Sequence, residues 1–265
     1  MSGGLKKKLD AGGTAIGTML SELHTPNVIR MLAAGGFEFV IVDCEHGPFD
    51  YTAVAQLIAV GRGEGLAVLV RVPGVDREYI LKYMDMGAAG IVVPMVSHPD
   101  AIAQAVRHAK YAPLGRRGVS TQRSHANYRV DDLPAYLQEA NDATVVFAQI
   151  ETAEGLENAG AIAATPGTDG LLLGPNDLLL ELGAPGRFDD PRLADAVARI
   201  AGAAKKAGRW SGVITSRQDL IASGVQAGMR VLSWNSEAGM LLQAARDGAA
   251  RLREAAFRHG NNGHL

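Results

Sequence analysis

The chain has 265 residues and a formal net charge of −2, and 47% of its residues are hydrophobic. A sequence of this size can bury a large core in one or two domains. The near-neutral charge provides no basic surface for nucleic acid or an anionic membrane, so a small molecule is the expected partner. The single cysteine excludes an intrachain disulfide, and no apolar run is long enough to span a bilayer. These features predict a cytoplasmic protein.

Short apolar stretches alternate with longer stretches rich in alanine and charge. The expected strands are residues 14–20, 39–45, 67–72, 90–96, 144–151, 170–175, 210–215 and 230–235. The expected helices between them are residues 26–36, 51–65, 77–90, 99–111, 133–142, 154–167, 191–208 and 217–228, and a final helix covers roughly 237–257. Several of these helices end in glycine just before the next strand, as helix C-terminal caps do.

This continuous alternation of eight strand–helix units predicts an α/β fold. The strands are short and apolar throughout, as expected when both faces of a parallel sheet are buried. We predict a single (β/α)8 TIM barrel domain over residues 1–265 with an extra C-terminal helix, and a doubly wound open sheet is the alternative. The longest irregular stretch, residues 112–132, is expected to fold over a site or to reach a neighbour.

The second predicted strand ends in a run of ionisable residues, within "FVIVDCEHGPFD" (39–50). Side chains alternate along a strand, so Asp43 and Glu45 share one face and Cys44 points the other way, toward the helices. His46 is the first residue beyond the strand. Asp43 and His46 make a plausible orienter and base, because the carboxylate would fix the tautomer of the imidazole.

Other polar residues fall at the carboxyl ends of further strands, which build the reactive face of a barrel. Arg71 ends the third strand, Gln149 and Glu151 share a face on the fifth, and "GPND" places Asp177 in the loop after the sixth. A salt bridge could explain each residue singly, but the set at one face indicates a site. Glu151 and Asp177, with water, suit a hard cation such as Mg²⁺ or Mn²⁺. Arg71 could hold a carboxylate or a developing oxyanion.

Two kinds of covalent catalysis are disfavoured. None of the seven lysines lies at the carboxyl end of a predicted strand, which argues against a Schiff-base mechanism. Cys44 is expected on the helix side and is therefore no nucleophile, and His125, in the long irregular stretch, receives no role. No glycine-rich phosphate loop is present, but backbone N–H groups at Gly174 and Pro175 could receive a carboxylate.

Four segments carry a resemblance to a known family. They read "VDCEHGPFD", "RVPGVDREYILKYMDMGAAGIVVPMV", "APLGRRGV" and "AQIETAEGLENAGAIAATPGTDGLLLGPNDL". In this order and spacing the chain resembles, over nearly its whole length, the HpcH/HpaI aldolases, which are metal-dependent class II pyruvate aldolases. The resemblance implies a (β/α)8 barrel that reversibly cleaves 4-hydroxy-2-oxo acids to pyruvate, or a close 2-oxo acid, and an aldehyde through a metal-bound enolate.

The resemblance also implies residue roles. Glu151 and Asp177 would bind the divalent cation, Mg²⁺ or Mn²⁺ with Co²⁺ as a further option, while His46 and Asp43 would act through water as the acid–base pair. Substrate-binding roles fall to Arg71, which would also steady the enolate, to Gln149, and to the backbone at Gly174 and Pro175. Family members are typically hexamers that exchange the last helix, and Asp85 would reach a neighbouring subunit's site, although its position places it at the other barrel end.

The chain departs from the family pattern on the aldehyde side. Met19 takes the place of a tryptophan in the first strand, and the last strand ends in Trp234 and Asn235. Two other functions remain open. One is a decarboxylase, because the same enolate arises when an oxaloacetate-type 2-oxo acid loses CO₂. The other is a non-catalytic barrel that binds a metabolite or a partner.

Overall fold

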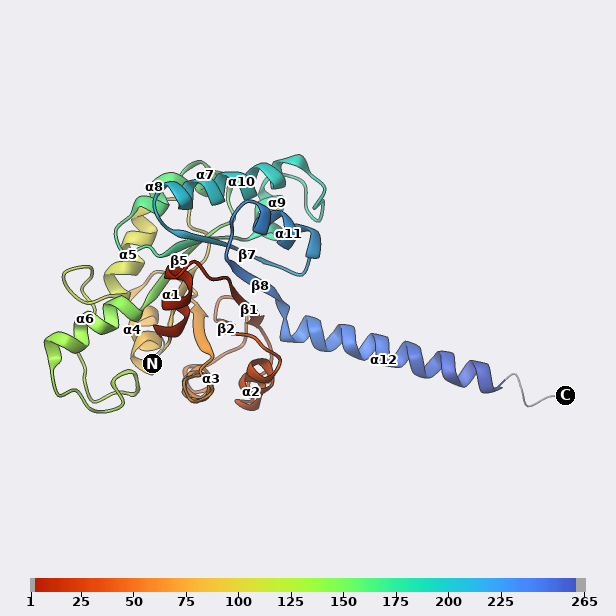
Figure 1. The fold of residues 1–265 in the computed structure, drawn as a ribbon, viewed down its shortest axis with the longest axis horizontal. Coiled ribbons are helices and arrows are strands. Elements are labelled where there is room, and N and C mark those ends of the chain that lie inside the picture. The colour runs from red at the N-terminus through yellow and green to blue at the C-terminus, as the bar shows by residue number, and fades with distance from the viewer. Residues whose placement is uncertain (1–2, 261–265) are drawn as a thin grey trace.

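The protein forms a closed barrel of eight parallel strands surrounded by helices (Figure 1). The computed structural model describes residues 3–260, so residues 1–2 and 261–265 of the predicted domain lie outside the described residues. The strands follow chain order around the barrel, and β8 pairs with β1 to close it. The predicted (β/α)8 barrel is confirmed, and the doubly wound alternative is wrong because an open sheet would leave two unpaired edges.

All eight expected strands are present. They are β1 (Ala15–Leu20), β2 (Phe39–Asp43), β3 (Ala67–Arg71), β4 (Gly90–Val93), β5 (Val145–Ile150), β6 (Gly170–Leu173), β7 (Trp210–Thr215) and β8 (Val231–Ser236). The expected ranges ran too far beyond β2, β4 and β6. Past β4, Met95 has a φ of 53°, and past β6, Pro175 already begins a helix. Hydrophobicity alone could not mark those ends.

The helices cover the outside of the barrel and its ends. They are α1 (Gly3–Asp10), α2 (Asn27–Ala34), α3 (Tyr51–Glu64), α4 (Arg77–Met86), α5 (Pro99–Ala109), α6 (Leu133–Ala143), α7 (Ala153–Glu157), α8 (Ala159–Ala164), α9 (Pro175–Glu181), α10 (Pro191–Lys206), α11 (Gln218–Gln226) and α12 (Glu237–Gly260), with a 3₁₀ turn η1 (Ser124–Ala126). Gly65 and Gly87 follow α3 and α4 with φ of 73° and 96°, which confirms two of the expected glycine caps. The expected helix over 154–167 is divided at Asn158, and α1 and α9 were not expected.

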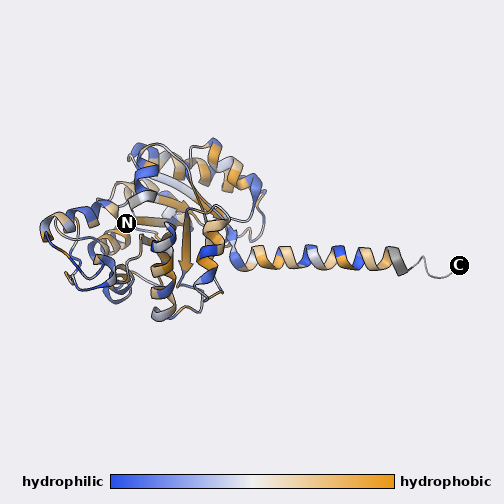
Figure 2. Ribbon diagram, turned by 60° about the horizontal axis from the view of Figure 1, so that its bottom comes forward, coloured by the Kyte–Doolittle hydropathy of each residue, from blue (hydrophilic) through white to orange (hydrophobic). Residues whose placement is uncertain are grey.

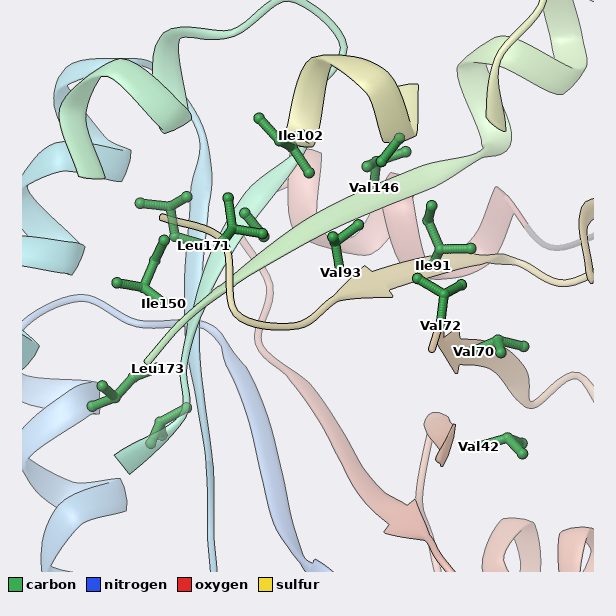
Figure 3. Close-up of a cluster of buried hydrophobic side chains, with 14 of the residues drawn as sticks. Val42, Val70, Val72, Ile91, Val93, Ile102, Val146, Ile150, Leu171 and Leu173 are labelled. Carbon is green, nitrogen blue, oxygen red and sulfur yellow. The ribbon is translucent and has the colours of Figure 1, made fainter. Parts of the chain in front are cut away.

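Two apolar layers stabilise the barrel. One layer lies between the strands and the helices, where β-branched side chains such as Val42, Val70 and Ile91 pack outward (Figure 3). The other fills the barrel interior with alternate residues of the same strands, among them Ile41 and Leu69. Alternation along each strand therefore determines which polar side chains reach the interior at the strand ends.

The last helix, α12, leaves the end of β8 and projects away from the barrel (Figure 1). It matches the helix expected over 237–257. Apolar and polar residues mix along it (Figure 2), and Leu241, Leu242, Leu252 and Phe257 are exposed. On the outer face of β1, Thr18 and Leu20 are buried, whereas Ile16 is 48% exposed. Among residues 3–260, no helix is long and apolar enough to cross a membrane.

Candidate active site

The carboxyl ends of β2 and β3 bring Asp43 and Arg71 side by side. The two residues are register partners in the sheet. Arg71 Nε donates to Asp43 Oδ1 at 2.9 Å and Nη2 donates to Oδ2 at 2.6 Å, and both side chains are buried. This two-point contact fixes the plane of the guanidinium. Burial opposes ionisation of Asp43, but the hydrogen bond and charge of Arg71 outweigh it and hold the pKa of Asp43 below its usual value.

Asp43 also shapes the turn that follows β2. Its Oδ1 accepts the backbone N–H groups of Glu45 at 3.2 Å and of His46 at 3.3 Å. The expectation that its carboxylate orients the imidazole of His46 stays a prediction, because the structure shows a contact with the backbone of His46 and none with its ring. Both carboxylate oxygens are used by Arg71 and the turn, so Asp43 contacts His46 through the backbone. The imidazole itself is 69% exposed at the mouth of the barrel.

Glu45 is a further member of this cluster. It was expected on the same strand face as Asp43, but no role was predicted for it. Its Oε2 lies 3.3 Å from Arg71 Nε and 3.8 Å from His46 Nε2. Burial raises the pKa of Glu45, Arg71 and His46 oppose the rise, and the charges of Asp43 and Asp177 add to it. The two-residue period from Asp43 was the signal that could have singled it out.

Cys44 lies between these acids in sequence but not in space. It packs against the outer apolar layer, as expected from alternation along the strand. Burial raises the pKa of its thiol to about 11, so the thiolate is scarce at neutral pH. The expectation that Cys44 is no nucleophile therefore has a physical basis in the fold.

Glu151 follows β5 and is 1% exposed. Its carboxylate accepts the N–H of Met95 at 2.7 Å and a short hydrogen bond from Gln149 Nε2. Burial raises the pKa of Glu151, and the charge of Asp177 adds to the rise against the hydrogen bonds and Arg71. The Oε1 of Gln149 is buried without a hydrogen-bond partner among the described residues. A buried carboxylate with no cation in contact is a site that favours a bound positive charge.

Gly174 makes room for this carboxylate. A Cβ at position 174 would collide with Glu151 Oε2 and would lie 3.0 Å from Gln149 Nε2. The expectation that N–H groups of Gly174 and Pro175 receive a substrate carboxylate is corrected by the structure. The Gly174 N–H already donates to the Ile150 carbonyl at 3.1 Å, and proline has no N–H. The contribution of Gly174 is space rather than a hydrogen bond.

Asp177 lies in the first turn of α9 rather than in a loop, and its side chain is exposed. The strands before Glu151 and Asp177 are neighbours in the barrel, as expected. We call Asp43, Glu45, Glu151 and Asp177 the mouth carboxylates. Among residues 3–260, Arg71 pairs with Asp43 and Glu45, and the exposed His46 lies near Glu45, whereas Glu151 and Asp177 have no ion pair. Among the described residues no group of three or more His, Cys, Asp or Glu side chains has metal-binding geometry.

Asp85 lies elsewhere. It is near the end of α4, which leads into β4, so it belongs to the amino-terminal end of the barrel, as its sequence position indicated. There it accepts from Arg117 Nη2 at 2.7 Å, and His125 Nε2 is 3.7 Å away. The lysines also avoid the mouth, because all seven lie within or directly after α1, α4, α5 and α10. This placement agrees with the argument against a Schiff base.

Comparisons with known proteins identify the family. The model of the HpcH/HpaI aldolase/citrate lyase family matches residues 18–244. The chain is 35% identical to the 4-hydroxy-2-oxovalerate aldolase of Rhodococcus jostii, with 95% of this chain and 96% of that protein aligned. It is 34% identical to the hydroxypyruvate/pyruvate aldolase of Deinococcus radiodurans, over 96% and 91% of the two chains.

A solved structure agrees with these sequence matches. The HpcH/HpaI aldolase of Desulfitobacterium hafniense superposes with a TM-score of 0.91 at 32% identity, over 94% of this chain and 96% of that one. A fold match of this extent and a sequence match that includes both β2 and α9 point the same way. The chain therefore belongs to the HpcH/HpaI aldolase/citrate lyase family.

Proposed function

We propose that the protein is a divalent-metal-dependent aldolase, a carbon–carbon lyase that reversibly cleaves 4-hydroxy-2-oxo acids to pyruvate and an aldehyde. The observation that carries the proposal is the charge imbalance at the mouth. The mouth carboxylates number four, Arg71 pairs with two of them, Asp43 and Glu45, and burial raises the pKa of Glu45 and Glu151. Such a cluster is stable when a cation completes it. The relatives named 4-hydroxy-2-oxovalerate aldolase support the same substrate class.

The donor chemistry fits a hard divalent cation. Glu151 and Asp177 offer carboxylate oxygens, which Mg²⁺ and Mn²⁺ prefer and Co²⁺ accepts, and water and substrate oxygens would complete the coordination. When bound, the cation would polarise the 2-oxo group of the substrate. Gln149 donates to Glu151 and would keep its carboxylate oriented toward the mouth. The free Oε1 of Gln149 would also be available to a substrate or water donor.

Arg71 would stabilise the charge that develops during cleavage. When the bond between C3 and C4 breaks, its electrons form the enolate of pyruvate, whose oxygen carries negative charge. The guanidinium of Arg71 is permanently charged and is fixed in plane by Asp43, so it needs no rearrangement to receive that charge. Asp43 therefore contributes to catalysis by positioning Arg71, in addition to shaping the turn at His46.

His46 would move the proton. In the cleavage direction the 4-hydroxyl loses its proton, through water, to the imidazole, and the aldehyde leaves as the enolate forms. Protonation of the enolate at C3 then gives pyruvate. The exposed imidazole has access to the mouth, and its Nε2 lies 3.8 Å from Glu45 Oε2. Asp43, Glu45 and His46 would therefore act together, rather than Asp43 and His46 alone.

A decarboxylase acting on an oxaloacetate-type 2-oxo acid is the second candidate. It is favoured by the fact that Arg71 and the mouth carboxylates would serve the same enolate when CO₂ is the leaving group. That reaction requires no proton transfer from a 4-hydroxyl. Replacement of His46 by alanine would therefore spare CO₂ release but would abolish aldol cleavage.

The projecting helix supports a homo-oligomer in which α12 is exchanged between subunits. Its exposed Leu241, Leu242 and Phe257 need an apolar surface, and the outer face of β1 offers one at Ile16. Exchange of identical elements is a common route to symmetric assemblies. We retain the hexamer, the contribution of Asp85 to a neighbouring site and the cytoplasmic location as expectations from sequence and resemblance.

The deciding experiment is hydrogen exchange at the methyl group of pyruvate in D₂O, followed by NMR. It requires no knowledge of the aldehyde. We expect exchange that needs Mg²⁺ or Mn²⁺, stops with EDTA, and falls by about a thousandfold or more in Glu151→Ala and His46→Ala. Glu157→Gln, an exposed substitution on α7, is the matched control. A folded wild-type protein without exchange in any metal would rule out the proposal.

A further inference from the structure

The first residue of α12, Glu237, is a buried carboxylate outside the cluster described above. It is 5% exposed, and the ion pairs found among residues 3–260 do not include it. A buried carboxylate without a cationic partner is costly unless hydrogen bonds replace the lost water. The hydrogen bonds that Glu237 accepts therefore indicate its structural role.

Its partners are consecutive backbone groups of one loop. Oε2 accepts the N–H of Ser21 at 2.8 Å and its hydroxyl at 3.3 Å. Oε1 accepts the N–H of Glu22 at 2.6 Å and of Leu23 at 2.9 Å. These N–H groups converge on one anion as in a backbone nest. Glu237 thus fixes the conformation of residues 21–26, the loop between β1 and α2.

A second contact ties the same loop to the candidate catalytic turn. The ring of His24 lies 4.8 Å from the ring of Phe49, in the segment between β2 and α3. Phe49 in turn covers Gly47, where a Cβ would lie 2.8 Å from its ring. The path from Glu237 through His24 and Phe49 therefore ends beside the turn that carries His46.

The barrel order shows which part of the substrate this loop would face. β5 is the fifth of eight strands in a closed ring, so Glu151 lies across the mouth from β1. In the proposed function the 2-oxo acid end is held near Glu151 and Asp177, and the 4-hydroxyl is at His46, after β2. The atoms beyond C4 then extend toward β1, over residues 21–26.

We propose that Glu237 is a positioning residue that holds the β1–α2 loop as the wall of the aldehyde side of the mouth, and thereby sets selectivity for the aldehyde. The proposal rests on the proposed aldolase function. Glu237 touches neither pyruvate nor the reacting atoms. Its loss would displace the wall and leave the pyruvate half of the site in place.

The test compares the two halves of the reaction in Glu237→Gln, which keeps the size of the side chain but leaves one oxygen for four donors. We expect metal-dependent exchange of the pyruvate methyl group within about twofold of the wild type. The kcat/KM for aldol cleavage should fall by about 10- to 100-fold, mainly through KM, and the preference between short and long straight-chain aldehydes should change. Backbone amides 21–23 should lose protection from hydrogen exchange.

Glu157→Gln, which removes an exposed charge, should change none of these values. His24→Ala alters an exposed side chain on the same path and should shift aldehyde preference in the same direction by a smaller factor. If Glu237→Gln fails to fold, His24→Ala becomes the deciding variant, and an unchanged aldehyde preference in it would overturn the proposal. Unchanged preference in folded Glu237→Gln, or equal losses in exchange and cleavage, would overturn it as well. Absence of exchange in the wild type would instead overturn the aldolase function itself.

Discussion

The two ends of the barrel both bury charge, but they balance it differently. At the amino-terminal end, Asp169 accepts from Lys6 at 2.7 Å, from Lys110 at 2.9 Å and from the Val146 N–H at 2.9 Å. At the carboxyl-terminal mouth, Arg71 pairs with Asp43 and Glu45, and no ion pair is found among residues 3–260 for the other two mouth carboxylates. The acid of the amino-terminal cluster finds its cationic partners, two lysines, within the chain. The mouth is incomplete within the chain, which is what a site for a cation and an anionic substrate requires.

The largest expected effect comes from removing the acid of the amino-terminal cluster. Asp169→Ala should lower the free energy of unfolding by about 3–5 kcal/mol, because it leaves the buried Lys110 and the neighbouring Lys6 without their acid. Chemical denaturation of the variant would measure this loss. Asp142→Ala, an exposed change on α6, should stay within about 0.5 kcal/mol of the wild type. A loss no larger than that control would show that the amino-terminal cluster contributes nothing to stability.

The next prediction distinguishes the positive charge of Arg71 from the geometry of its guanidinium. Arg71→Lys keeps the positive charge, but an ammonium cannot reproduce the two-point contact with Asp43. The rate of pyruvate methyl exchange should fall by about a hundredfold while the melting temperature changes little. Arg30→Lys, at an exposed arginine, is the control. Full activity in Arg71→Lys would mean that charge alone suffices there.

Supplying a cation should give the mouth carboxylates a positive partner, as Asp169 already has at the other end. At 100 times its dissociation constant, Mg²⁺ or Mn²⁺ should stabilise the folded protein by about 2.7 kcal/mol. For a chain of this size that corresponds to a rise in melting temperature of roughly 5–10 °C over a sample in EDTA. Glu151→Gln should abolish the rise. The same rise in that variant would place the cation elsewhere.

The smallest effect concerns a second cluster at the amino-terminal end. Burial, then the positive charge of Arg117, lowers the pKa of His125 below 6.5, against the opposing charge of Asp85. The neutral ring therefore contributes stability that is present above pH 6.5 and is lost as the pH falls toward the pKa of the folded state. Below pH 6.5, His125→Asn should reduce the fall in melting temperature by a few degrees at most. An identical slope in the variant would contradict this assignment.

Much of this architecture was predictable from residues with clear local signals. Strand alternation placed Asp43 and Cys44 on opposite faces, and the glycines after α3 and α4 marked their ends. Partners distant in sequence were not predictable. The carboxylate of Asp43 divides its hydrogen bonds between Arg71 and the turn after β2. This division depends on the register of β2 with β3, which only the closed sheet defines. The contact of Glu237 with Ser21 spans 216 positions and has no local pattern.

The raised pKa of the partly buried Cys44 thiol has a practical consequence. With its pKa raised to about 11, only about one thiol in a thousand is ionised at pH 8, so maleimides and iodoacetamides would react with it slowly. The natural chain is therefore already a suitable background for site-directed labelling. A cysteine introduced at an exposed position of α12 could carry a spin label or a dye without removal of the native residue. Distances between such probes would report directly on where the last helix resides in the assembled protein.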